Sequence, residues 1–564
     1  MHIFNPDDIE DRLIALKDRV GLHDLDQTYM EIYNRVPGKR AREHLAIALH
    51  WMLACKEPMS IHRLIEVLKF KTLRPAEPGL PNKSSSYVHR DYVLGLTSNF
   101  LILSGSEAVQ TKCATAKEEN QDGGKMHAFE HHNPEVVQFA HASVKEFFQT
   151  KAEFSDEFSD ANANIQVSID CLNYVMAPDL VFIDPWNFQI NAERFTFQQY
   201  AFGYWISHCA LAGSGRLEND TLRKPFEKLM LGESSTAALL TWAEQISRSD
   251  GHRLRSVTSM SPINFFLACA VGFTDILDAL LQTQADTVTL STEEGKTGLH
   301  IAAHFDQAEV LEWFLYPTKS RGVDVTTKDK IGRTALHDAA KEGNLKACQV
   351  LLSAADISTV INSQDLWSYT PLLSALSSTE GRLNTVKALL EHPDTTTGWK
   401  DTSLNNELHY AVQSSSDIQL VRLLLVKEAK KATGRHGECR ASWGMVNALN
   451  MTVGNTPLHD AMAHSDVRVL SLLLGEPYIK ISENDDGLTP FQLALDDEMW
   501  TAHRWGGWPD SECLAPDRIM AFLNADVKIP VDQLREALSK AKEYGPEFGT
   551  AEVIMALQER ISSL

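Results

Sequence analysis

Four histidines recur in the second half of the chain and are the first candidates for chemistry. They are His300, His337, His409 and His459. Imidazole can serve as a general acid, a general base or a metal ligand near neutral pH, so a cluster of these side chains could form a catalytic or metal site. Each histidine stands at the same position of its own sequence repeat, however. We therefore expect structural hydrogen bonds and neither catalysis nor metal binding.

Two further groups of side chains could do chemistry. His141 and Ser143 have the spacing of a base and a nucleophile on one face of a strand, but no acid is placed to orient the histidine. A histidine at a strand end and a serine that caps a helix explain both residues. His127, His131, His132 and His141 could bind a metal, although no cysteine joins them and their spacing matches no zinc pattern. We expect no cofactor.

Gly295-Lys296-Thr297 resembles the end of a phosphate-binding loop, GxxxxGK[ST]. The glycine required five residues before Gly295 is missing, because position 290 is Leu. The sequence also shows no HExxH, GxSxG, GxGxxG or CxxC motif. We therefore expect neither an enzyme nor a small-molecule substrate, and an enzyme with an unrecognised site is the less favoured alternative.

The elements that carry these residues are internal repeats. The clearest unit runs from Gly332 to Asn344 and is followed by an apolar stripe at Val350–Leu352. The fourth motif residue of each copy lies at positions 264, 300, 337, 373, 409, 459 and 492, in steps of 36, 37, 36, 36, 50 and 33. This spacing resembles the ankyrin repeat, whose period is about 33, with one long insertion around residues 427–450.

The resemblance to ankyrin repeats implies a mechanical role for each motif residue. Thr caps the first helix of a unit, Pro occupies its first turn, and the imidazole bridges backbone groups of adjacent units. Since no unit buries its apolar face alone, stacking of neighbours provides the stability. The residues in this structural role are Thr297, His300, Thr334, His337, Thr370, Pro371, His409, Thr456, Pro457, His459, Thr489 and Pro490.

Ankyrin arrays bind protein partners with the loop tips ahead of each unit and the adjoining helices. Trp367 is the strongest candidate, because an aromatic side chain on a rigid tip often anchors an interface. Packing of Trp367 against the next tip is the alternative. The other candidates are Glu294, Lys296, Lys328, Asp329, Lys330, Arg333, Asp365, Tyr369 and Asp485.

The first 150 residues predict helices followed by two strands. Apolar periodicity indicates helices up to about Phe70, one of them capped by Ser60. The apolar runs 100–103 and 136–140 predict paired strands, and the intervening residues 104–133 are too many for a tight hairpin. Ser143 has the capping-box spacing that begins the next helix. Helices before a two-stranded wing form a winged-helix pattern.

The order of motifs in this half resembles the region after the NTPase core of fungal NACHT and ankyrin proteins. The motifs lie at Leu25–Tyr29, at Trp51 with Pro58–Ser60, at Phe139–Phe147, at Cys171–Tyr174 and at Tyr200–His208. Members with nucleotide-switch activity carry the phosphate loop that this sequence does not show, so we expect no ATP hydrolysis. The resemblance implies a scaffold, a degenerate innate-immunity receptor or adaptor, or a transcription coregulator of a secondary-metabolite gene cluster.

Composition restricts the partners and the compartment. The chain has 564 residues, 43% hydrophobic and 23% charged, with a formal net charge of −22. Such a chain can bury large cores, and its surface repels phosphate backbones and anionic lipids. No secretory signal is visible at Met1–Asp8, the eight cysteines form no disulfide-like pattern, and the longest apolar run, Phe265–Phe273, is too short to cross a membrane. We expect an intracellular protein of the nucleus or cytoplasm.

Lys39, Arg40 and Arg42 fit a short nuclear-targeting pattern, although an exposed helix start is the simpler explanation. The sequence as a whole predicts a mostly α fold. It comprises a winged-helix-like region at 1–150, a helical linker at 151–258, an ankyrin α-solenoid of about seven units at 259–500 and a helical C-terminal cap at 501–564. The predicted function is non-catalytic protein binding, without membrane insertion and without direct nucleic-acid contact.

Overall fold

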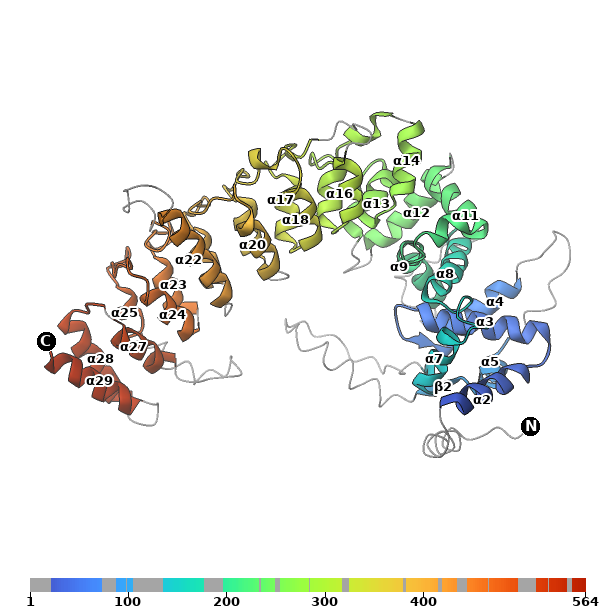
Figure 1. The fold of residues 1–564 in the computed structure, drawn as a ribbon, viewed down its shortest axis with the longest axis horizontal. Coiled ribbons are helices and arrows are strands. Elements are labelled where there is room, and N and C mark those ends of the chain that lie inside the picture. The colour runs from blue at the N-terminus through green and yellow to red at the C-terminus, as the bar shows by residue number, and fades with distance from the viewer. Residues whose placement is uncertain are drawn as a thin grey trace. The chain divides into compact units, whose positions relative to one another are not determined.

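The computed structural model contains two compact units, Met1–Leu267 and Ala268–Leu564 (Figure 1). Each unit is described here by itself, and the predicted four-domain division stays a prediction. The residues that the structure describes are 22–73, 88–97, 99–104, 135–176, 196–232, 235–248, 254–283, 285–316, 324–378, 382–413, 418–433, 444–464, 466–495, 514–525, 527–544 and 550–564.

The first unit begins with four helices and a small sheet. The helices are α2 (Leu22–Asn34), α3 (Gly38–Ala54), α4 (Ile61–Leu73) and α5 (Arg90–Thr97). Strands β1 (Met59–Ser60), β2 (Leu101–Ser104) and β3 (Val136–Phe139) form an antiparallel sheet in the order β1-β3-β2.

The sheet confirms the predicted strand pair and adds a third strand. Leu101 pairs with Phe139 across β2 and β3. Sequence reasoning missed β1, because two residues are too few to show an alternating pattern. Ser60 nevertheless caps α4 as predicted, since its hydroxyl accepts the Arg63 N–H at 3.1 Å. The predicted loop after Ser104 lies outside the described residues.

Helix α7 (Ala142–Thr150) is capped by His141, so the predicted capping role of Ser143 is wrong. The Ser143 N–H donates to His141 Nδ1 at 3.1 Å, because the helix begins one residue before Ser143. The Ser143 hydroxyl contacts that nitrogen at 2.7 Å and the Tyr29 hydroxyl at 2.8 Å. The cap and the Tyr29 contact account for both side chains. His127, His131 and His132 lie outside the described residues.

The helices that follow bury the remaining motif residues of the first unit. They are α8 (Asp160–Val175), α9 (Thr196–Leu211), α10 (Gly215–Glu218), α11 (Asp220–Leu231) and α12 (Ser235–Arg248). Asp170 of α8 accepts a hydrogen bond from Trp51 Nε1 at 2.9 Å and pairs with Lys71 at 2.9 Å. Tyr200 and His208 of α9 share a hydrogen bond at 2.8 Å. The motif residues are therefore core contacts.

Pairs of short helices make up the repeat region. The first helices of the pairs are α13 (Ile263–Val271), which crosses the boundary between the units, α15 (Gly298–His304), α17 (Ala335–Lys341), α19 (Pro371–Leu376), α21 (Glu407–Gln413), α23 (Pro457–His464) and α25 (Pro490–Leu493). Their partners are α14 (Thr274–Thr283), α16 (Ala308–Leu315), α18 (Leu345–Leu352), α20 (Arg382–Glu391), α22 (Ile418–Thr433), α24 (Val467–Leu474) and α27 (Leu514–Asn524).

The pairs of the second unit stack in chain order. From α15 to α25, each first helix contacts the next first helix, and the second helices from α14 to α27 form a parallel row (Figure 1). Helix α27 packs against α24 at the end of the second row. Helices α28 (Val531–Tyr544) and α29 (Thr550–Ser562) form a further pair at the C-terminal end. The predicted mostly helical fold is confirmed.

Candidate protein-binding site

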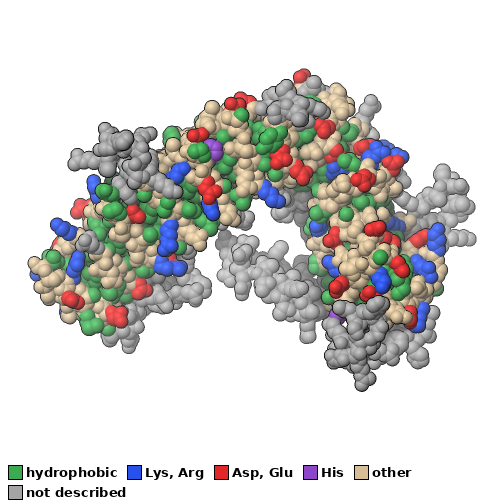
Figure 2. All heavy atoms as spheres, viewed as in Figure 1, with side chains coloured by type: hydrophobic (Ala, Val, Ile, Leu, Met, Phe, Trp, Pro, Cys, Tyr) green, Lys and Arg blue, Asp and Glu red, His purple; other side chains and the backbone are tan. Residues whose placement is uncertain are grey.

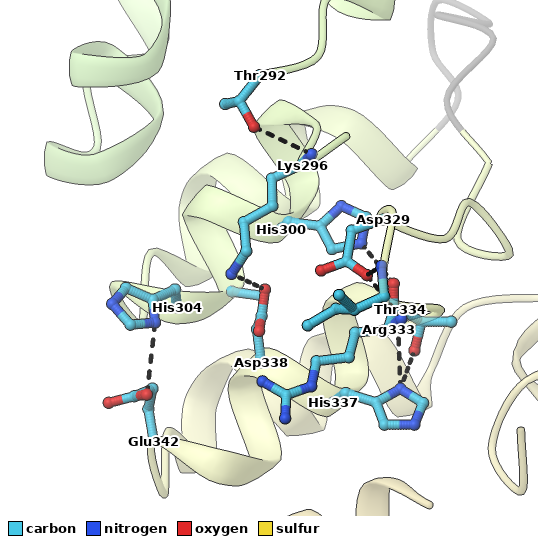
Figure 3. Close-up of polar contacts among 12 residues, drawn as sticks. Thr292, Lys296, His300, His304, Asp329, Arg333, Thr334, His337, Asp338 and Glu342 are labelled. Carbon is cyan, nitrogen blue, oxygen red and sulfur yellow. Dashed lines mark hydrogen bonds and ion pairs between the residues drawn. The ribbon is translucent and has the colours of Figure 1, made fainter. Parts of the chain in front are cut away.

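The repeat histidines link each unit to the next (Figure 3). The Thr297 N–H donates to His300 Nδ1 at 3.2 Å, and His300 Nε2 lies 3.0 Å from the carbonyl oxygen of Arg333 in the following unit. Because a backbone N–H can only donate, Nδ1 must accept and the proton must lie on Nε2, which donates to that carbonyl. His337, His409 and His459 make the same pair of bonds, with the carbonyl oxygens of Tyr369, Asn455 and Leu488.

This geometry gives the histidines no catalytic or metal-binding arrangement. Burial lowers the pKa of all four imidazoles, that of His337 to about 4, so they are neutral at pH 7. They follow one another unit by unit and do not share a cavity. Within the described part of the chain, no three His, Cys, Asp or Glu side chains are grouped so that they could hold a metal ion.

Six hairpin tips precede the first helices, and an Asx-type turn holds five of them. We number them tip one (residues 292–296), tip two (329–333), tip three (365–369), tip four (401–405), tip five (450–455) and tip six (484–488). In tip two, Asp329 Oδ1 accepts the N–H groups of Ile331 and Arg333 at 3.1 and 2.8 Å. Asp365, Asp401, Asn450 and Asn484 accept two backbone N–H groups in the same way.

Backbone hydrogen bonds join each tip to the next. The Lys330 N–H donates to the Glu294 carbonyl at 2.8 Å, the Leu366 N–H to Ile331 at 2.9 Å and the Thr402 N–H to Trp367 at 3.0 Å. Tips four to six are joined by the N–H groups of Met451 and Asp485. Since both ends of each contact are backbone groups, the tips form one continuous row whose spacing does not depend on side-chain rotamers.

The structure separates the predicted tip residues into turn residues and surface residues. Asp329 and Asp365 are 6% and 7% exposed and hold their turns, so they are not accessible to a partner. Glu294 in tip one, Lys330 in tip two and Asp485 in tip six are exposed. Lys328 lies just before tip two and donates to the Gln364 carbonyl at 3.3 Å.

Two predicted basic residues form ion pairs between neighbouring units, and Figure 3 shows the pair of Lys296 with Asp338. Lys296 of tip one contacts Asp338 of α17 at 3.0 Å, and the Asp338 side chain is 4% exposed. Arg333 of tip two contacts Asp365 of tip three at 3.1 Å, and the Asp365 side chain is fully buried. These carboxylates would be costly to leave unpaired, so both cations help to hold adjacent units together.

Trp367 both packs and remains accessible. The Arg333 guanidinium carbon lies 5.4 Å from the centre of the Trp367 ring, a cation–π contact, while 45% of the residue is exposed. Other large apolar residues are exposed on the same row of tips, namely Leu366 (67%), Leu404 (43%), Met451 (69%) and Leu488 (37%). Apolar side chains gathered on one row indicate an interaction surface.

Sequence reasoning missed tips four and five. Asp401 lies 36 residues after Asp365, which lies 36 after Asp329, so the repeat period of the turn residue could have located tip four. Asn450 follows the long insertion, which breaks the period. Tyr410 was also missed, although its hydroxyl donates to Asp401 at 2.6 Å and hydrogen-bonds Tyr369 of tip three.

The predicted targeting segment of the first unit lies at the start of α3. Lys39 and Arg40 are exposed, and Lys39 forms a loose pair with Glu43 at 3.9 Å. Arg42 instead donates to the carbonyl oxygens of Val36 and Asn34 at 3.3 and 3.2 Å, just after α2 ends. The segment is thus an exposed helix start with one side chain that has a structural role.

Comparison with known proteins identifies the repeats. A family model described as ankyrin repeats, in three copies, matches residues 265–361. The chain is 30% identical over 118 residues to the probable 26S proteasome regulatory subunit p28 of Saccharomyces cerevisiae, covering 21% of this chain and 49% of that protein. It is 31% identical over 227 residues to the ankyrin repeat protein nuc-2 of Neurospora crassa, covering 40% of this chain and 20% of that protein.

The matches span about half, or less, of these curated relatives. Among solved structures, the ankyrin repeat domain of Bcl-3 is 22% identical with a TM-score of 0.32, covering 41% of this chain and 92% of that domain. The human ASB11 ankyrin repeat domain is 20% identical with a TM-score of 0.34, covering 48% and 99%. The family model matches the stretch from helix α13 to helix α18 of the stacked pairs, and the chain is an ankyrin-repeat protein.

Proposed function

We propose that the chain is a non-catalytic scaffold that binds protein partners with its row of hairpin tips. The observation that carries this proposal is the set of exposed apolar residues, led by Leu366, Trp367 and Met451, on tips that backbone hydrogen bonds hold in a row. A preorganised row loses little conformational entropy on binding, which favours affinity. The matched repeat family is typically non-catalytic.

The distribution of charge favours protein partners over nucleic acid. On the face shown in Figure 2, basic and acidic side chains are interspersed, and the formal net charge of −22 opposes approach to a phosphate backbone. Among the described residues, no helix is both long and apolar enough to cross a membrane.

Within this proposal, the first 150 residues form a winged-helix-like packing module. The order α3, β1, α4, α5, β2, β3 supports this assignment. The helix before the strand pair, α5, carries a single cation, Arg90, which pairs with Glu135 at 2.7 Å. Since that charge is already matched, α5 is poorly suited to a phosphate backbone.

The finer proposal is a transcription coregulator that acts in the nucleus. The exposed Lys39 and Arg40 at the start of α3 support it. Replacing Lys39 and Arg40 by Ala together should then abolish nuclear enrichment of a fluorescent fusion, while Arg42 stays in place to hold α2. If the protein instead served as an adaptor for an NTPase-bearing receptor, as the family resemblance implies, it would oligomerise with that receptor in response to a ligand.

Replacing Trp367 by Ala tests the scaffold directly. We expect the variant to lose capture of its partners from native cells without unfolding, because Trp367 is half-exposed and its main chain, which accepts the Thr402 N–H, is unchanged. Trp313→Ala is the matched control, since Trp313 lies in α16, in the second row of helices. Quantitative mass spectrometry of captured proteins measures the effect, and circular dichroism checks folding. Full capture by Trp367→Ala would remove Trp367 from the binding surface.

A further inference from the structure

A groove lies between tips three and four and the first helices next to them. Its volume is about 450 Å³, and its lining includes Arg333, Lys341, Trp367, Ser374, Asn405 and Tyr410. It is therefore bordered by the end of α17, by α19 and α21, and by tips three and four.

Among the described residues, Lys341 is an unpaired cation of this groove, and the nearby carboxylates already have hydrogen-bond partners. Asp365 and Asp401 are 7% and 5% exposed and accept backbone N–H groups, and their second oxygens accept from Arg333 and Tyr410. Lys341 is exposed, and within the described part of the chain no carboxylate lies within 4 Å of its ammonium group. Since Arg333 is already paired with Asp365, Lys341 is the groove cation whose charge a ligand can match.

Two polar atoms of the groove lack hydrogen-bond partners. Ser374 Oγ and Asn405 Oδ1 are buried and unpaired, and Ser374 as a whole is 2% exposed. A buried polar atom without a partner costs free energy, which a ligand recovers if it supplies the missing bond. Asn405 Oδ1 can only accept, so the ligand must offer an N–H or O–H donor. The backbone of an extended peptide offers such donors at regular intervals.

We propose that this groove binds a short, extended, acidic segment of a partner protein that carries an apolar side chain. A carboxylate of the segment faces Lys341, the apolar side chain packs on Trp367, and a backbone N–H donates to Asn405 Oδ1. The inference rests on the proposed scaffold function and specifies the chemistry of its partner.

The net charge of the chain limits the length of this segment. A formal charge of −22 repels a long acidic polypeptide, whereas short-range attraction to Lys341 acts within about a Debye length, ~8 Å at physiological salt. The binding segment should therefore be short and its neutral anchor essential. Binding should weaken as salt rises from physiological to high concentration.

Selection from a random 12-residue peptide display library on the full chain tests the proposal. In the peptides enriched on the wild type, the number of Asp and Glu residues is compared with the number of Lys and Arg residues. The most enriched peptide is then synthesised, and its binding is measured by fluorescence anisotropy. We expect an acidic excess with an aromatic or aliphatic residue, and binding at least tenfold weaker to Lys341→Glu and to Trp367→Ala. Lys346→Glu in α18 is the control, because it makes the same charge change on an exposed residue outside the groove lining.

The outcomes separate this inference from the scaffold function. Enriched peptides that are neutral or basic, or that bind Lys341→Glu as well as wild type, overturn the acidic segment. If such peptides still lose binding to Trp367→Ala, the tips remain a binding surface and only the partner chemistry is wrong. Peptides indifferent to both variants, or an absence of enrichment, count against both the groove and the tip surface.

Discussion

Ser368 and Leu404 hold a backbone conformation that other tips give to glycine. Their φ angles are 62° and 61°, while Gly332 and Gly487 at the equivalent positions have φ angles of 80° and 74°. A side chain in this left-handed region costs about 1–2 kcal/mol. The strain occurs in tips three and four, which flank the proposed groove. The side chains of Ser368 and Leu404 thus add to the surface of these tips but lower the stability of the folded array.

Replacing Ser368 or Leu404 by Gly should stabilise the array by up to ~1 kcal/mol, because relief of the left-handed strain exceeds the entropy that glycine adds to the unfolded chain. Urea unfolding followed by circular dichroism measures this change. Gly332→Ser is the reverse control and should destabilise, since a Cβ there would also meet the Asp365 Cα at 3.3 Å. Equal stability of Ser368→Gly and wild type would contradict the inference that the backbone of Ser368 is strained.

At the scale of elements, the hairpin tips depend on a carboxylate or amide that closes each turn. Asp365 closes tip three through the N–H groups of Trp367 and Tyr369, both at 2.9 Å, and also pairs with Arg333. The Asp365 side chain thus stabilises both its own turn and the contact with the neighbouring unit. The turn and the ion pair can be separated by substitution, because Asn keeps the accepting oxygen and loses the charge.

Asp365→Ala should lower the free energy of unfolding by ~3 kcal/mol, because two backbone donors and the Arg333 guanidinium lose a buried partner. Asp365→Asn should cost less, ~1–2 kcal/mol, since Oδ1 still closes the turn. Denaturant titration of both variants shows which substitution lowers the free energy of unfolding more. If Asn proved as damaging as Ala, the ion pair rather than the turn would dominate.

Periodic elements were predictable and short ones were not. The two strands 101–104 and 136–139 and the helix that follows Ser60 carry clear apolar or capping patterns. Strand β1 has two residues and exists only because β3 lies beside it. His141 replaces Ser143 as the cap of α7 because the helix begins earlier than the capping-box spacing indicates. Local pattern cannot locate an element whose partner is distant in sequence.

At the scale of the whole molecule, the bridging histidines make the repeat array sensitive to acid. Each imidazole must stay neutral, because a proton on Nδ1 would face a backbone N–H. Its folded-state pKa lies below the ordinary value, so the unfolded chain binds more protons as pH falls. This stability is present above about pH 6.5 and is lost progressively towards the folded pKa, which is about 4 for His337.

His337→Gln should reduce the loss of stability between pH 7.5 and pH 5 by ~2 kcal/mol relative to wild type, the amount expected when a pKa of about 4 replaces the ordinary value. Gln suits this position, because Gln492 accepts the Thr489 N–H at 2.9 Å in the last repeat. Thermal unfolding across this pH range measures the difference.

Glu407 has the opposite effect on the pH dependence of stability. Burial raises its pKa to about 7, so acidification stabilises the folded chain at this residue. Comparing His337→Gln with wild type at each pH cancels this contribution, because both chains contain Glu407. An unchanged pH dependence in the variant would show that His337 is not the neutral bridge described above.

The sequence by itself determined the repeats, the structural role of Thr and His in each unit, and the positions of tips one, two, three and six, because these depend on local pattern and on spacing. Only the tertiary structure decided which tip residues are accessible. Asp329 and Asp365 turn inward to close their turns, whereas Leu366 and Trp367 remain exposed. The groove also required the fold, because Arg333, Ser374 and Tyr410 come from three successive units that only stacking brings together.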